Sequence, residues 1–318
     1  MSALLNEVTV IPYLKERGVI TGEAIVEELT GGVSNVVLGI KTAEKDLVLK
    51  QALPQLKVAR EWLADQRRAI VEADAMRLFH SLTPDAVPAI IDNDPKEFTL
   101  TMERLPRDCV NWKEEMLAGR ANPIIGSRLG QILATWHNFG AAHSEVREKF
   151  MEDSLFEQLR ISPFYRAVAE VNPDISVIPE LIKENEEVKS TLVHGDFSPK
   201  NIMITRDFFP IVLDFEVEHT GNPVFDLAFV MAHLLCKYIK LGIPELSETA
   251  INFLNSYKKY ATLEVPPSLA HHIALVALAR VEGVSPSNYL NDRDKIEIQR
   301  ITKKILRQRI ADVSELFN

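Results

Sequence analysis

HGDFSPKNIMITRDFFPIVLDFE, residues 194–216, places a histidine, two aspartates and an asparagine at fixed separations across a short hairpin. Asn201 follows Asp196 by five positions, and an apolar run delivers Asp214. The apolar runs predict two strands, 201–205 and 210–215. Asp196 alone also fits a turn. However, an aspartate closing an apolar strand beside a second acidic group is costly unless a cation lies there, so the stretch favours a metal site.

A phosphoryl-transfer site needs a carboxylate that orients and deprotonates an alcohol. It also needs an amide oxygen and a carboxylate that hold Mg²⁺ against nucleotide phosphates. The spacing resembles the H-x-D-x-x-x-x-N catalytic loop of the protein-kinase fold, followed by its metal-binding aspartate. The variant HGD…N…DFE resembles the aminoglycoside phosphotransferase and choline kinase group of small-molecule kinases. This resemblance implies that Asp196 is the catalytic base, that Asn201 and Asp214 bind Mg²⁺, and that His194 supports the loop. The roles of Lys200 and Glu216 stay open.

Upstream, the chain predicts a small sheet with one long helix. Alternating apolar residues and turn signals predict a short helix and five strands, at 9–17 and at 24–29, 33–41, 46–53, 88–92 and 98–103. The helical run 58–82 places Glu72 on an apolar face, where a carboxylate needs a cation. Lys50, at the end of a strand, would by itself be read as an edge or surface residue. The resemblance implies instead that Lys50 pairs with Glu72 and holds the nucleotide phosphates.

The turn GGVSN, residues 31–35, is the candidate phosphate-covering loop. By itself Gly-Gly predicts only a hairpin turn, and neither G-x-G-x-x-G nor a Walker motif is present. The resemblance assigns phosphate contacts to this loop, and adenine contacts to the backbone of the hinge near 101–108. The nucleotide-binding residues expected in these two segments are Gly31, Gly32, Ser34, Asn35, Met102, Glu103 and Leu105.

Beyond the hinge the pattern turns helical. Apolar residues from Ile125 to Phe139 predict an amphipathic helix, and the run after Asp226 predicts a buried one. Asp226 is well placed to accept backbone donors at the start of that helix, and the resemblance implies that it braces the catalytic loop. A second buried helix is expected at 269–282 and a covering helix at 296–317. Possible substrate contacts, or merely a solvated helix end, are Arg280, Glu282 and Tyr289.

The whole-chain resemblance implies an α+β, two-lobed protein-kinase-like fold. A small antiparallel β-sheet lobe with one long helix, residues 1–104, would bind the nucleotide. A larger, mainly helical lobe, residues 105–318, would carry catalysis and the substrate. The implied activity is an ATP- and Mg²⁺-dependent phosphotransferase acting on a hydroxyl of a small molecule. The alternatives are a nucleotide-binding pseudokinase-like module that acts through a partner, or a protein Ser/Thr kinase.

Composition limits the partners. The net charge of −9 argues against nucleic acid as the main partner and is compatible with a cationic substrate. No run of 18 apolar residues is present and the N-terminus lacks a leader pattern, so we expect a cytoplasmic protein without membrane association. Cys109 and Cys236 are far apart and are expected to be reduced thiols. An aminoglycoside acceptor would want clustered carboxylates, and choline an aromatic cage. A sugar-like acceptor stays open too, as does the oligomeric state.

Overall fold

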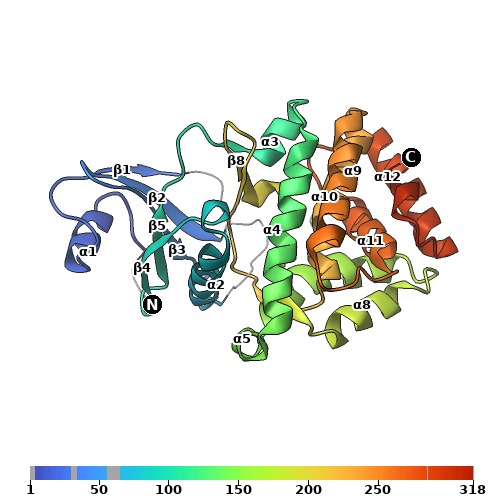
Figure 1. The fold of residues 1–318 in the computed structure, drawn as a ribbon, viewed down its shortest axis with the longest axis horizontal. Coiled ribbons are helices and arrows are strands. Elements are labelled where there is room, and N and C mark those ends of the chain that lie inside the picture. Colours follow the sequence, from blue (N-terminus) through green and yellow to red (C-terminus); the bar gives the residue numbers. More distant parts are fainter. Residues whose placement is uncertain (1–3, 30–33, 56–64, 285, 318) are drawn as a thin grey trace. The chain divides into compact units, whose positions relative to one another are not determined.

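The computed structural model describes residues 4–29, 34–55, 65–284 and 286–317 (Figure 1). The chain divides into two compact units, Met1–Arg107 and Asp108–Asn318. The sequence placed this boundary at residue 104. The assignment of nucleotide binding to the first unit and of catalysis to the second stays a prediction.

The first unit is built on an antiparallel sheet of five strands in the order β1-β2-β3-β5-β4 (Figure 1). Its strands are β1 (Ile25–Glu28), β2 (Asn35–Lys41), β3 (Asp46–Ala52), β4 (Ile90–Asp94) and β5 (Thr99–Glu103). Its helical elements are α1 (Val10–Glu16), α2 (Arg68–Leu82) and the 3₁₀ turn η1 (Pro84–Ala86). The expected small antiparallel lobe with one long helix is therefore present.

Two helices cover the faces of this sheet. α1 packs with alternate residues of β2 and β3, including Leu38, Ile40 and Leu49, in one apolar core. α2 contacts β3, β4 and β5. The helical run expected at 58–82 is present as α2 from Arg68 onward; residues 65–67 are not helical, and residues 58–64 lie outside the described residues. Before α2, the Asp65 carboxylate accepts the Arg67 amide at 2.9 Å, a local turn that competes with helix formation.

The second unit is mainly helical. Its helices are α3 (Trp112–Leu117), α4 (Pro123–Ala142), α5 (Ser144–Lys149), α6 (Ser154–Phe156), α7 (Ala167–Val171), α8 (Ile178–Glu187), α9 (Val224–Leu241), α10 (Pro244–Tyr260), α11 (Leu269–Glu282) and α12 (Asp292–Gln308). A π-helical segment and two 3₁₀ turns complete them, η2 (Glu157–Arg166), η3 (Pro199–Asn201) and η4 (Val313–Leu316). Short strands form two small sheets, β10 (His219–Gly221) with β7 (Thr191–Val193), and β6 (Val110–Asn111) with β8 (Ile202–Ile204) and β9 (Pro210–Val212).

The core of this unit lies where its apolar helices meet. α4 runs beside α10, and α11 packs on both α9 and α12 (Figure 1). α9 and α11 are buried nearly all round, as their sequences predict. The covering helix expected at 296–317 differs, because a capping box of Asn291 and Asp294 starts α12 earlier. Arg309, with a left-handed φ of 52°, ends it.

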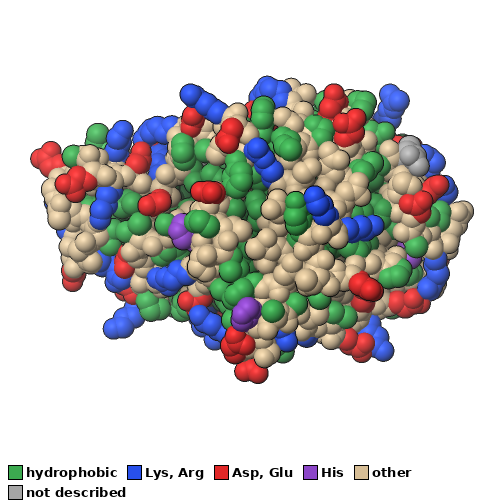
Figure 2. All heavy atoms as spheres, in the orientation of Figure 1, with side chains coloured by type: hydrophobic (Ala, Val, Ile, Leu, Met, Phe, Trp, Pro, Cys, Tyr) green, Lys and Arg blue, Asp and Glu red, His purple; other side chains and the backbone are tan. Residues whose placement is uncertain are grey.

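Acidic and basic side chains are interspersed on the face that Figure 2 shows, so this face carries no continuous field of one sign. Among the described residues, no helix has the length and apolar character needed to cross a membrane. Cys109 and Cys236 are both free thiols.

Candidate active site

The loop after β7 is fixed by its backbone. Gly195 has a left-handed φ of 72°, and a Cβ there would lie 2.9 Å from the carbonyl oxygen of Val217. Asp226, in the first turn of α9, accepts the amide of His194 at 2.8 Å and that of Gly195 at 3.0 Å. This carboxylate is fully buried. Both amides immediately precede Asp196, so Asp226 fixes the backbone that carries Asp196.

Side chains from two further helices, α4 and α10, extend the hydrogen-bond network around Asp226. His137 of α4 lies with Nε2 at 3.4 Å from the Asp226 carboxylate, and its Nδ1 is 2.8 Å from the hydroxyl of Tyr257 on α10. On the other side, the His194 ring lies with Nε2 3.2 Å from the carbonyl of Leu213, just before Asp214. The His194 side chain thereby joins the two segments of the hairpin, while His137 links α4 and α10 to Asp226.

The Asp196 carboxylate is buried among cations of its own unit. Its Oδ2 lies 2.9 Å from Nη2 of Arg160 and 2.8 Å from Nζ of Lys200. Burial alone would raise the pKa of Asp196, but the charges of Arg160 and Lys200 outweigh it and hold the pKa below the usual value. The negative charge of Asp214, in contrast, raises the pKa of Asp196. Asp196 is therefore an anion at neutral pH, with Asp214 close enough to influence it.

Oxygen donors suited to a hard cation meet beside this carboxylate. Asn201 donates through Nδ2 to the carbonyl of Asp196 at 3.1 Å, which directs its amide oxygen the other way. Asp214 follows β9 with a left-handed φ of 72°, a conformation that costs energy in a residue with a side chain. Two carboxylates and an amide oxygen form a donor set of the kind that Mg²⁺ binds. Among the described residues no cluster of three or more His, Cys, Asp or Glu side chains forms an alternative metal site.

The first unit contains the expected ion pair. Lys50 Nζ lies 2.6 Å from Oε1 of Glu72, and the two side chains are 11% and 3% exposed. Lys50 projects from β3, opposite Val37 and Leu100 on the neighbouring strands. Glu72 projects from α2. The pair thus joins the sheet to its long helix, while its contact with a nucleotide stays a prediction.

The candidate phosphate loop is described only in part, because Gly31 and Gly32 lie outside the described residues. Asn35 donates through Nδ2 to the Ser34 hydroxyl at 2.9 Å. The buried guanidinium of Arg68 donates to the carbonyls of Ser34 and of Leu53, at 2.5 and 2.8 Å. Arg68 therefore anchors the end of this loop to α2.

In the segment expected to form the hinge, part of the backbone already hydrogen-bonds within the sheet or to residues beside it. Met102 lies in β5, between partners on β3 and β4. The amide of Glu103 donates to the carbonyl of Ala89 at 2.9 Å, and the amide of Arg104 donates to that of Asp46 at 3.0 Å. An adenine contact through a backbone amide would consequently fall to Leu105, the next residue.

The three possible substrate residues differ in how far their side chains are already engaged by neighbouring residues. Glu282 accepts hydrogen bonds from Asn172 at 2.7 Å and Gln299 at 2.6 Å, and pairs with Lys303 at 2.7 Å. Its carboxylate is thus engaged with neighbouring helices. Arg280, in contrast, lies with its guanidinium carbon 5.7 Å from the ring centre of Phe164 and donates to Ser287 at 3.0 Å. Tyr289 stacks under another cation, Lys237, at 5.2 Å.

Sequence reasoning missed two arginines, Arg160 beside Asp196 and Arg68 at the end of the candidate phosphate loop. Arg160 lies in η2, whose π-helical turns alter the side-chain spacing expected of an α-helix. Its cationic contact with Asp196 spans 36 positions and left no periodic signal. Arg68 had a weak signal, since a basic residue on the same apolar helix as Glu72 also needs partners.

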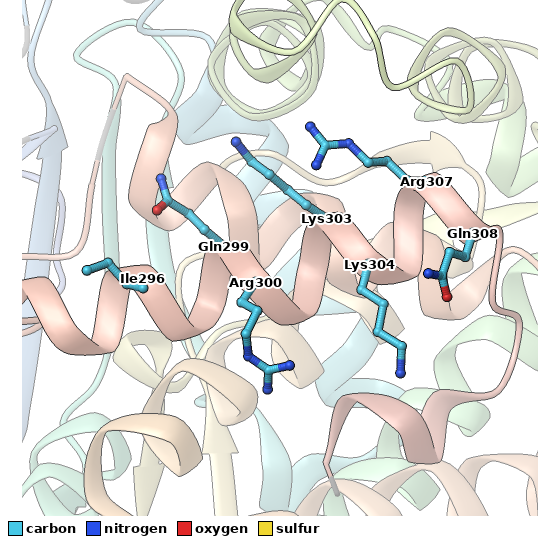
Figure 3. A pocket seen from close by; sticks show the side chains of 7 residues that line it. All are labelled: Ile296, Gln299, Arg300, Lys303, Lys304, Arg307 and Gln308. Atoms are coloured by element: carbon cyan, nitrogen blue, oxygen red, sulfur yellow. The ribbon is translucent and has the colours of Figure 1, made fainter.

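A large surface hollow lies elsewhere, along α12 (Figure 3). Its lining residues are Ile296, Gln299, Arg300, Lys303, Lys304, Arg307 and Gln308. Each of its four cations already pairs with a carboxylate, those of Glu297, Glu282, Glu315 and Asp174. None of the lining residues contributes to the cluster around Asp196, so this hollow is not the candidate site.

Known proteins share both the sequence pattern and the fold. Residues 25–263 match the model of the phosphotransferase enzyme family. Methylthioribose kinase of Bacillus cereus (strain G9842) is 26% identical over 264 residues, 73% of this chain and 66% of that protein. The match therefore spans slightly less than two thirds of that relative.

Solved structures agree in fold at low identity. Macrolide 2′-phosphotransferase from Brachybacterium faecium aligns with a TM-score of 0.57 at 19% identity, over 85% of this chain and 88% of that one. Spectinomycin phosphotransferase, solved with ADP and spectinomycin, aligns with a TM-score of 0.56 at 12% identity, over 98% of each chain. The α+β, protein-kinase-like fold expected from the sequence is thereby confirmed.

Proposed function

The chain belongs to the phosphotransferase enzyme family, and we propose that it transfers the γ-phosphoryl group of ATP to a hydroxyl of a small molecule. The observation that carries this proposal is the cluster of the buried Asp196 and Asn201 with the half-buried Asp214, whose loop backbone the Asp226 carboxylate fixes at His194 and Gly195. A buried carboxylate beside a second carboxylate is costly, and a divalent cation with nucleotide phosphates is a partner that such a set fits.

Asp196 orients the acceptor in this mechanism. Its carboxylate accepts a hydrogen bond from the acceptor hydroxyl, whose oxygen attacks the γ-phosphorus. A bond forms between these atoms, the bond from the γ-phosphorus to the β–γ bridging oxygen breaks, and the hydroxyl proton passes to Asp196. The lowered pKa of Asp196 keeps it anionic but makes it a weak base. This suits a loose transition state, in which positioning matters more than early proton removal.

Asn201 and Asp214 would hold Mg²⁺ through the amide oxygen and a carboxylate oxygen. Bound there, Mg²⁺ supplies charge that neutralises the phosphate oxygens as the bridging bond breaks. Lys200 contacts Asp196 directly, so its ammonium group is placed to stabilise negative charge on the transferred phosphoryl group. In the first unit, Lys50, oriented by Glu72, supplies a cation for the nucleotide phosphates. ADP in the spectinomycin phosphotransferase structure supports the same nucleotide chemistry.

A small-molecule acceptor is favoured over a protein. Residues 219–221 form β10, paired with β7, and α9 begins at Val224. Only nine residues separate Asp214 from α9, so no long activation segment lies there. The pseudokinase-like alternative would require the loss of a reacting residue, whereas Lys50, Asp196, Asn201 and Asp214 are all present.

The test is acceptor-stimulated ADP release across a panel of small alcohols, with Asp196→Asn as the variant. We expect transfer to fall about 10²–10⁴-fold, while ADP binding by calorimetry stays nearly unchanged. Asp207→Asn, an exposed aspartate on the turn between β8 and β9, is the matched control and should keep full activity. Transfer retained by Asp196→Asn would exclude Asp196 as the base. ADP binding without stimulated release for any alcohol would instead support a binding module.

A further inference from the structure

Cationic side chains from five elements of the second unit, α3, η2, η3, α9 and α11, act on Asp196 or on the nearby ring of His233. We call this set the basic cluster: Lys113, Arg160, Lys200, Lys237 and Arg280. Arg160 and Lys200 contact the Asp196 carboxylate directly. The remaining three have no role in the mechanism above.

A stripe on α9 connects the Asp196 carboxylate to the far end of the cluster. Phe229, His233 and Lys237 follow one another at four-residue spacing, so they share a helix face. The Arg160 guanidinium, which touches Asp196, lies 5.7 Å from the ring centre of Phe229. The rings of Phe229 and His233 are 5.2 Å apart. The Nζ of Lys237 lies 3.3 Å from the carbonyl of His233.

Four members of the basic cluster act on the same imidazole ring, that of His233. Burial is the first cause that lowers the pKa of this imidazole well below its usual value, and the second is a set of positive charges. That set comprises Lys237, Arg280, Lys200 and Lys113. Four cations from separate elements therefore act on one ring, and the ring itself stays neutral.

Lys237 is the member that folding alone does not explain. Its side chain is 1% exposed, and within the described part of the chain it forms no ion pair with a carboxylate. Burial, helped by the charges of Lys113 and Arg280, lowers its pKa from 10.5 to about 7. A buried cation without an anion costs stability. An anionic ligand would supply the missing partner.

Arg280 presents a second cation to the same place. Its guanidinium lies over Phe164 and donates through Nε to Ser287, but in the described residues it has no carboxylate partner. Its charge acts on Lys237, and it is itself influenced by Asp196 and Arg160. Planar guanidinium donors suit carboxylates and phosphates.

We propose that the acceptor alcohol carries an anionic group, a carboxylate or a phosphate ester, which Lys237 and Arg280 bind while its hydroxyl meets Asp196. This proposal rests on the phosphotransfer proposed above and names the acceptor class for it. A positively charged acceptor would instead meet like charges, because Glu282, the acidic candidate of this region, is engaged by Asn172 and Lys303.

The probes are four six-carbon polyols that differ at one end: gluconate, glucitol phosphate, glucitol and glucamine. Binding to the full chain saturated with ADP and Mg²⁺ is measured by calorimetry at constant ionic strength. We expect either anionic polyol to bind at least about ten-fold more tightly than glucitol, and glucamine most weakly. The two anionic arms distinguish a carboxylate from a phosphate. Equal affinities, or no binding of any of the four, overturn the proposal.

Two variants locate the effect. Lys237→Met and Arg280→Met should each weaken anion binding about ten-fold and leave the affinity for ADP unchanged. Lys240→Met, one turn further along α9 and paired with Asp294, is the matched control. Lys237→Arg retains the charge and should recover part of the binding. If both methionine variants lose ADP affinity instead, the cluster serves the nucleotide and the proposal fails.

The same assay separates this proposal from the proposed function. Anion binding without phosphoryl transfer to any alcohol would contradict the phosphotransferase activity but not the anion site. Transfer to neutral or cationic alcohols, at rates that Lys237→Met and Arg280→Met do not change, would leave the activity standing and exclude the anion site.

Discussion

Asp226→Asn should destabilise the protein strongly and disturb the proposed transfer site at the same time. The Asp226 side chain is fully buried, and its two oxygens accept the amides of His194 and Gly195 at 2.8 and 3.0 Å. Asparagine has a single oxygen, so one amide would face an NH₂ group. A lost charge-assisted bond costs about 1.5–3 kcal/mol, and an unsatisfied buried donor about 1–3 kcal/mol. We therefore expect a loss of about 3–5 kcal/mol in the free energy of unfolding.

Urea denaturation followed by circular dichroism measures this change, because the midpoint falls while the slope is kept. Asp174→Asn is the control for the same substitution at an exposed ion pair with Arg307, where we expect a change of about 0–1 kcal/mol. In the folded fraction, transfer should fall while ADP binding persists, since only the backbone that carries Asp196 moves. A loss below about 1 kcal/mol for Asp226→Asn, equal to that of the control, would refute the role of this brace.

Three further results follow from the same structure. Lys50→Ala should weaken ADP binding about ten-fold in calorimetry with Mg²⁺, whereas Lys45→Ala, on the turn before β3, should not. Burial lowers the pKa of the His219 imidazole from 6.5 to about 4, so the unfolded chain takes up a proton at a higher pH than the folded protein does. The protein should therefore lose stability as the pH falls from about 6.5 to 4. His219→Gln should flatten that part of a profile of melting temperature against pH. Lys237→Met should stabilise the protein below pH 7, and the gain should shrink as the pH rises toward 10.5, where the unfolded lysine also loses its proton. A gain that is constant with pH would contradict the buried-charge explanation.

The sequence predicted those features that local patterns or short motifs encode. Alternation along β2 and β3 and the apolar face of α4 follow from periodicity, and all three elements are present. For the Lys50–Glu72 pair, the residues indicated that Glu72 on an apolar helix face needs a cation, and the resemblance identified Lys50 as that cation. The brace by Asp226 followed from a resemblance, and the structure supplies its geometry.

Other features depend on contacts that no local pattern encodes. Residues 65–67 were expected to be helical, but a side-chain turn at Asp65 precedes α2, which begins at Arg68. Arg160 reaches Asp196 from a π-helical segment, whose spacing a period of 3.6 residues cannot register. Lys237 was hidden because its neighbours in α9 are apolar, and a lysine there reads as a snorkelling side chain.

The net charge of the whole chain and the local charges around His233 favour acceptors of opposite sign. A net charge of −9 is compatible with a cationic substrate, but that value sums acidic residues over the whole surface. A buried site responds to the charges within a few ångströms, where the effective dielectric constant is lower. Around His233 those charges are all positive. Lys237 adds a buried positive charge to this group, and burying that charge costs stability. A costly residue of this kind can be explained by the binding of a ligand. The positive charges around His233 therefore make anionic alcohols the first acceptors to test.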